Sequence, residues 1–185
     1  MMAALHRKAS SRRKVLLALL LQVAGFAVCD RAVAKEAPAK QSPGSIWQIL
    51  ETLRHQVPFS KEKIETHLAM HLAQVGTAGN DVFLFYGGRG PTTTDGVVLG
   101  DVELRIKRSG AHAGILVLRL EGACIGLEQV RSNVGQLEIT DTPRGRSLDE
   151  ETSYTARLSW ADVSFGFAER NPRCLAAISI NPRNP

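Results

Sequence analysis

The sequence lacks the short motifs that most readily identify a hydrolase. Neither G-x-S-x-G, a turn that exposes a nucleophilic serine, nor H-E-x-x-H, the zinc-protease helix motif, occurs among its 185 residues. A catalytic cysteine needs a neighbouring base, and no cysteine–histidine arrangement of that kind is readable. The sequence therefore predicts no catalytic residue, no metal site and no cofactor.

The chain has no apolar run of the roughly 20 residues that a membrane-spanning helix needs. The run from Val15 to Val28 is shorter, follows a basic stretch, and is followed by the small-x-small pattern Ala32-Val33-Ala34. These features are typical of a secretory signal peptide, so we predict that residues 1–34 are removed and that the protein is periplasmic or secreted. Cleavage after Ala27, an uncleaved anchor, and a lipoprotein with lipid on Cys29 are alternatives that the sequence leaves open.

Basic charge is in excess only because of this leader. The whole chain carries 23 Lys and Arg against 18 Asp and Glu, but residues 1–34 hold six of the basic residues and one of the acidic residues. The remaining chain has equal numbers of both signs. Nucleic-acid binding, which calls for a basic surface, is therefore not predicted.

Cysteine is scarce, with three residues in the chain. Removal of the leader would leave Cys124 and Cys174 in a compartment that permits disulfides, so we predict that these two are bonded. Such a bond closes a loop of about 50 residues and stabilises the fold by roughly 4 kcal/mol in the chain-entropy model. Two free, buried cysteines are the alternative.

The rest of the chain divides into residues 35–44, a polar Pro-containing linker, and residues 45–185, a single α+β domain. Ser45 and Gln48 form a capping box that predicts a first helix from Ile46 to about Gln56. Ser60 caps a second helix, whose apolar stripe continues through Leu72 and Val75 to a stop at Gly76. A short third helix is predicted after Gly126, in the middle of the domain.

Strands account for the remaining apolar residues. Residues 101–122 alternate in polarity with period two on either side of a turn-rich break, which predicts a hairpin at the centre of an antiparallel sheet. Further strands are predicted at residues 82–86, 136–140, 154–160, 163–167 and 174–180. The predicted fold is thus two N-terminal helices and one short middle helix packed on an antiparallel sheet.

The order of elements also suggests two helix-then-strands repeats, residues 60–122 and 124–180. This arrangement resembles the helix-then-antiparallel-sheet modules of beta-lactamase inhibitor protein and of small outer-membrane assembly lipoproteins. The likeness is one of architecture over most of residues 45–180. It rests on no shared motif, so no functional residue is carried over from it.

His67 and His71 have the i, i+4 spacing at which two histidines can share a metal. The residue after the first histidine is Leu68, where the zinc-protease motif has its glutamate. A helical projection places His71 inside the apolar stripe and His67 at its edge. We therefore predict two structural histidines and no metal.

A binding function fits this sequence better than a catalytic one. We expect an exported protein-binding domain with a protein partner in the cell envelope, such as an inhibitor, a toxin-immunity protein or an envelope-assembly factor. The alternative is a small envelope hydrolase that uses carboxylates and a histidine; its candidate residues are Glu138, Asp141, Asp162 and His112.

Two long glycine-containing loops carry the candidate partner contacts. Arg89 lies in the loop 87–96, and Arg144 and Arg146 lie in the loop 141–152. Arginine is enriched at interface hot spots, and glycine lets a loop approach a partner closely. Whether the two loops share a face of the molecule is left open by the sequence.

Overall fold

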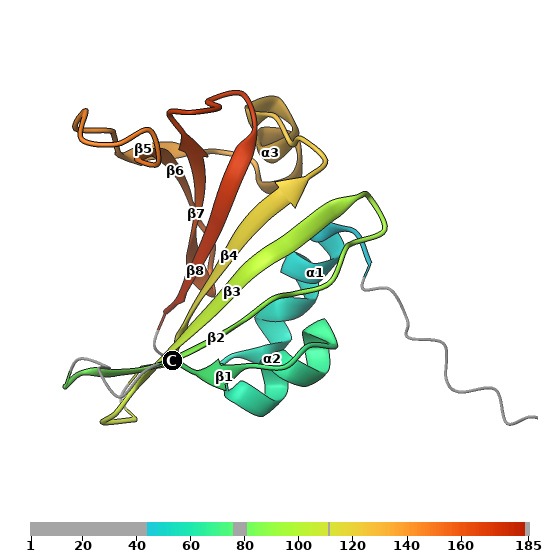
Figure 1. The fold of residues 1–185 in the computed structure, drawn as a ribbon, viewed down its shortest axis with the longest axis vertical. Coiled ribbons are helices and arrows are strands. Elements are labelled where there is room, and N and C mark those ends of the chain that lie inside the picture. Colours follow the sequence, from blue (N-terminus) through green and yellow to red (C-terminus); the bar gives the residue numbers. More distant parts are fainter. Residues whose placement is uncertain (1–43, 76–80, 111, 184–185) are drawn as a thin grey trace, which may run out of the picture. The chain divides into compact units, whose positions relative to one another are not determined.

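A computed structural model describes residues 44–75, 81–110 and 112–183 (Figure 1). The predicted signal peptide and nearly all of the predicted linker lie outside these residues. The described helices are α1 (Ile46–Leu53), the 3-10 turn η1 (Arg54–Gln56), α2 (Lys61–Leu68) and α3 (Leu127–Val134). The described strands are β1 (Ala73–Gln74), β2 (Phe83–Gly88), β3 (Val97–Lys107), β4 (Ile115–Gly122), β5 (Glu138–Asp141), β6 (Glu151–Arg157), β7 (Ala161–Ala168) and β8 (Leu175–Pro182).

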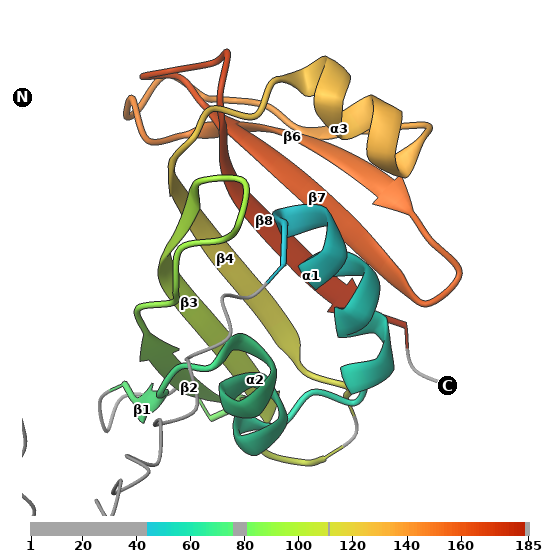
Figure 2. The same cartoon turned by 90° about the vertical axis from the view of Figure 1, so that its right-hand side faces the viewer.

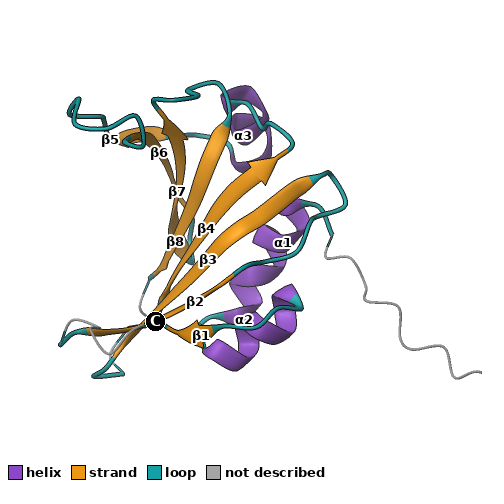
Figure 3. Cartoon of the chain, in the orientation of Figure 1, coloured by secondary structure: helices purple, strands orange, loops and turns teal. Residues whose placement is uncertain are grey.

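All of these strands belong to one antiparallel sheet with the order β1-β2-β3-β4-β8-β7-β6-β5 (Figure 3). The α+β class and the β3–β4 hairpin are as predicted. The middle of the sheet, however, is the β4–β8 pair, so only β4 of the hairpin is a middle strand. Strand order depends on contacts between the two halves of the chain, which the local pattern of polarity does not encode.

Each half of the sheet is a meander of four strands that follows a helix in the chain. α2 precedes β1 to β4, α3 precedes β5 to β8, and the last strands of the two halves pair with each other, Leu116 opposite Ile180 and Leu118 opposite Ile178. All four of these side chains are fully buried. The apolar last strands therefore join the two halves.

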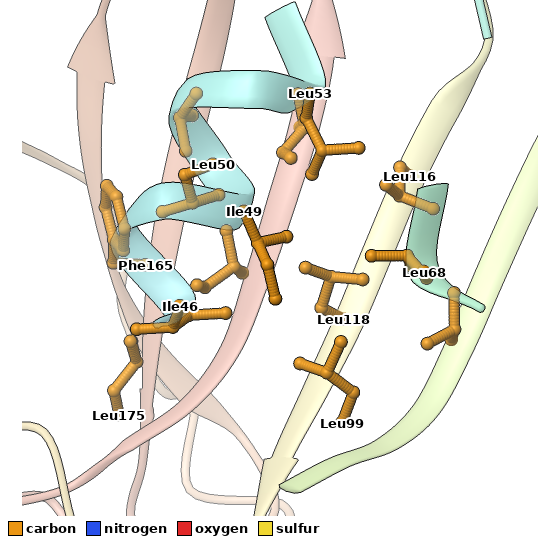
Figure 4. Close-up of a cluster of buried hydrophobic side chains, with 14 of the residues drawn as sticks. Ile46, Ile49, Leu50, Leu53, Leu68, Leu99, Leu116, Leu118, Phe165 and Leu175 are labelled. Atoms are coloured by element: carbon orange, nitrogen blue, oxygen red, sulfur yellow. The ribbon is translucent and has the colours of Figure 1, made fainter. Parts of the chain in front are cut away.

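Helix α1 lies over one face of the sheet and packs its apolar side chains into the core (Figure 2). The capping box is formed as predicted, since the Ser45 Oγ accepts from the Gln48 N–H at 3.3 Å and the Gln48 Oε1 accepts from the Ser45 N–H at 2.9 Å. The buried α1 side chains lie among those of β4 and β7 (Figure 4); they are Ile46, Ile49, Leu50 and Leu53.

Helix α2 is shorter than predicted. It ends at Leu68 because Ala69 adopts a left-handed conformation, with a φ of 50°, and its N–H turns back to the carbonyls of the last helical turn. Leu72 is still buried, but the chain that carries it is no longer helical, and Val75 is exposed. Ala69 is neither Gly nor Asn, the usual residues at such an end, so this helix end has no signal in the sequence.

The predicted disulfide is confirmed. Cys124 and Cys174 are bonded, with a Cα–Cα distance of 5.0 Å. The bond ties the segment between β4 and α3 to the start of β8, and next to it the Leu175 N–H donates to the Ile125 carbonyl at 2.8 Å. A disulfide is consistent with an extracellular or periplasmic location. Within the described part of the chain, no helix combines the length and the apolar character needed to cross a membrane.

Candidate functional site

No described helix lies on the sheet face opposite α1 and α2, which we call the uncovered face (Figure 1). Strand alternation turns Val117, Arg119 and Glu121 of β4 toward it, while the leucines between them face the helices. In the register of the sheet, Arg119 stands opposite Ala177 of β8, and Ala177 stands opposite Gly166 of β7. Because Ala177 has only a methyl group and Gly166 has no side chain, the surface beside Arg119 is open.

An ion pair crosses this open surface and joins two strands that are not neighbours. Arg119 on β4 pairs with Glu151 on β6, across β8 and β7. The Glu151 carboxylate rests directly on Gly166, where a Cβ atom would lie 2.0 Å from its Oε2. A side chain at this position would displace the carboxylate from its place on Gly166.

A second ion pair brings Arg89 to the same end of the uncovered face. The Arg89 Nη2 lies 3.4 Å from the Oε2 of Glu121, two residues beyond Arg119 on β4. Both side chains are largely exposed. The antiparallel order of the strands places the β2–β3 loop, with Arg89, and the β5–β6 loop at one end of the sheet (Figure 1).

The β5–β6 loop is held by one of its own carboxylates. Glu150 Oε2 accepts from the Arg144 N–H at 2.6 Å and from the Arg146 N–H at 3.3 Å. Both arginine side chains line a groove of about 350 Å³, and so do Arg119 and Glu151. We call this hollow the arginine groove.

These contacts answer the question that the sequence leaves open. The two loops lie at one end of the sheet but do not share a face. The Arg89 side chain reaches Glu121 on the uncovered face, whereas Asp95, later in the same loop, accepts from the Ile46 N–H at the start of α1. Arg119 and Glu151 were missed because on a strand they look like ordinary solvent-facing charges. Gly166 inside a strand was the available signal, because such a glycine often marks a close approach.

The residues of the hydrolase alternative do not gather at one place. Arg157 bonds both Glu138, at 3.0 Å, and Asp162, at 3.3 Å, and these carboxylates raise the pKa of Arg157. Asp162 also bonds Arg183 at 2.9 Å. Asp141, at the other end of β5, lines the arginine groove. His112 lies in the β3–β4 turn, which joins different strands from those of Glu138 and Asp162, and its Nδ1 accepts from the Gly114 N–H at 3.1 Å.

The two histidines of the i, i+4 pair have separate partners. His67 is half-buried at the edge of α2, as predicted, and its Nε2 lies 3.0 Å from the Thr52 Oγ1 of α1. The prediction that His71 is buried is wrong, because α2 ends before it. The side chain of His71 is 81% exposed, and its Nδ1 lies 2.9 Å from Glu65. Among the described residues, no group of three or more His, Cys, Asp or Glu side chains is placed to hold a metal ion.

His67 should make the stability of the fold depend on pH. Burial lowers its pKa, against a smaller opposing effect of a hydrogen bond with the Ile49 backbone. The unfolded chain, with a histidine pKa of about 6.5, therefore takes up a proton first, and stability falls as the pH drops below that value. When the pH is lowered from about 7.5 to about 5.5, the denaturant concentration at the unfolding midpoint should decrease more for the wild type than for His67→Gln. An equal fall in both proteins would contradict the assignment.

Comparison of the chain with protein-family models, with curated proteins and with solved structures finds no match.

Proposed function

We propose that the chain is an exported protein-binding domain without a catalytic role, of the kind represented by inhibitors, toxin-immunity proteins and envelope-assembly factors. One observation carries the proposal: Arg144 and Arg146 of the β5–β6 loop line one groove with Arg119 of the uncovered face. Arginine is over-represented among the residues that dominate binding energy, and a sheet holds its loops rigidly.

The β5–β6 loop supports this proposal in a second way. Because Glu150 already fixes the backbone at Arg144 and Arg146, a partner would lose less free energy in ordering the loop. The groove is lined by three arginines and by four carboxylates, so the fitting partner is a protein of the cell envelope that presents groups of both signs to it. The signal peptide in the sequence and the disulfide agree with a periplasmic or secreted protein.

The repeat forms part of the same proposal. Two copies of a helix followed by four strands, joined through β4 and β8, would place their variable loops at both ends of one sheet. Loops of this kind are where binding residues are usually found.

The double substitution Arg144→Ala/Arg146→Ala should abolish most of the binding to this partner. The domain is first used to capture a protein from an envelope extract, and the affinity of the purified pair is then measured. Loss of a hot spot of about 2 kcal/mol or more corresponds to roughly a thirtyfold weaker complex. Arg89→Ala should weaken the complex less, because the Arg89 guanidinium already pairs with Glu121 at 3.4 Å and is less free to bind a partner.

The matched control is Arg131→Ala, which removes an exposed arginine from α3, on the helix side of the sheet, where it pairs with Glu128 at 2.5 Å. It should leave the affinity unchanged, and all variants should keep the thermal stability of the wild type. If neither loop variant weakens the complex even threefold, the loops are connections only, and the strands of the uncovered face become the place to test.

A further inference from the structure

A cleft of about 470 Å³ lies on the other side of the molecule, between α1, α3 and the β6–β7 turn. Figure 2 shows α1 and α3 on the same side of the sheet, with β7 passing between them. The chain has two tryptophans, Trp47 and Trp160, and both line this cleft. It faces away from the arginine groove, so what it binds is a separate question from the protein partner.

Helical spacing explains the α1 wall of the cleft. Trp47, Leu50, Glu51 and Arg54 follow one another at i, i+3, i+4 and i+7, which places them on one flank of the helix. Leu50 is buried, Trp47 is half-buried, and the two charged side chains are exposed. The wall therefore passes from apolar to charged over two turns of helix.

The floor of the cleft is closed, which limits what the cleft can accept. Val163 and Phe165 of β7 form the floor, and their exposures are 2% and 0%. The half-buried Trp160 and Leu158 stand at the turn, so the apolar surface within reach of a ligand is supplied by the walls. A bulky side chain of a partner peptide needs a deep apolar pocket, and this closed floor does not provide one.

The polar groups of the cleft include both donors and acceptors, and their charges cancel. Glu51 and Arg54 pair at 2.9 Å, and the exposed Asn133 and Ser159 add an amide and a hydroxyl. A charged ligand would meet one of the two charged groups unfavourably. An uncharged ligand with many hydroxyl groups could bond to all four.

We propose that the cleft binds a neutral carbohydrate through one or two sugar rings. The C–H groups on the face of a sugar ring form a flat apolar patch that packs against an indole, while its hydroxyl groups lie at the edge of the ring. Trp47 and Trp160 supply indoles, and Glu51, Arg54, Asn133 and Ser159 supply partners for the hydroxyl groups. The volume falls in the range of about 300 to 1,000 Å³ that is usual for ligand pockets.

Tryptophan fluorescence tests the proposal directly, because both tryptophans of the chain line the cleft. The protein, expressed from Met1 and purified from the cells, is titrated with maltotriose, cellotriose and chitotriose, and with an uncharged leucine-rich peptide. At least one trisaccharide should change the emission saturably, and the peptide should not. Trp160→Ala should weaken that sugar by about tenfold or more, as read from Trp47, since removal of a central aromatic contact has an effect of this size.

Glu51→Gln keeps the shape of the side chain and should weaken the sugar at least threefold. Its matched control is Glu128→Gln, which changes a second i, i+3 Glu–Arg pair, on α3 and outside the cleft lining. That control should bind as the wild type does. Should Trp160→Ala fail to fold, the two glutamate variants decide the question alone. The proposal is overturned if no trisaccharide changes the emission, if the peptide alone does, or if Glu51→Gln and Glu128→Gln bind the sugar equally.

Discussion

Replacement of Phe165 by alanine should cost about 3 to 5 kcal/mol of folding free energy, the range seen for truncation of a buried aromatic side chain. Phe165 is fully buried on β7, and Figure 4 shows it beside α1. It is held against the helix on one side and stands opposite Ile178 and Tyr154 on the neighbouring strands. Because α1 and the neighbouring strands hold the surrounding side chains in place, these side chains can fill only part of the cavity that the substitution leaves. Domains of this size have a total stability of about 5 to 15 kcal/mol, so the variant should be only marginally folded.

The control for this experiment is the same substitution on the other face of the sheet. Phe85 of β2 is half-buried on the uncovered face, with the Arg105 guanidinium 5.6 Å from its ring centroid. Phe85→Ala removes the same atoms but leaves no closed cavity, and it should cost clearly less than Phe165→Ala. Urea unfolding of both variants measures the difference. Equal losses would mean that α1 does not seal the core as described.

The local parts of this fold were predictable because short-range chemistry decides them. Ser45 and Gln48 fix the start of α1 within one turn, and the alternation around Leu104 fixes which face of β3 is buried. The disulfide followed from counting the cysteines that remain after the predicted leader, with no knowledge of the sheet. In each case the residues that decide the feature lie in one segment or form one pair.

The candidate surfaces were only partly predictable because they depend on strand order. The arginines of the two loops were identified from the sequence, but the placement of both loops at one end of the sheet follows from the strand order. The same order lets Arg119 reach Glu151 across Gly166. The cleft likewise joins Trp47 to Trp160, which lie more than a hundred residues apart in the chain. The end of α2 at Ala69 was missed for another reason, since a left-handed alanine gives no signal in a sequence.

Loss of the disulfide should destabilise the domain by about 4 kcal/mol, the chain-entropy value for a bond that spans 50 residues. The variant is Cys124→Ser/Cys174→Ser, because a single substitution would leave one reactive thiol. A local effect adds to the general one, since α3 has a single buried residue, Val130, and the disulfide lies just before the helix. Helices of eight residues are not stable alone, so α3 depends on this anchor for its position.

The measurement is urea unfolding of the wild type and of the double variant, each with and without a dithiol reductant. The wild type should lose stability on reduction until it matches the variant, and the variant should not respond to the reductant.

Intact mass spectrometry of the wild type from the envelope fraction should show the mass of the oxidised chain that begins at Lys35, as predicted from the sequence. Two free thiols in the unreduced protein, or an unchanged midpoint on reduction, would contradict the disulfide's role, and an intact Met1 would contradict the predicted removal of residues 1–34.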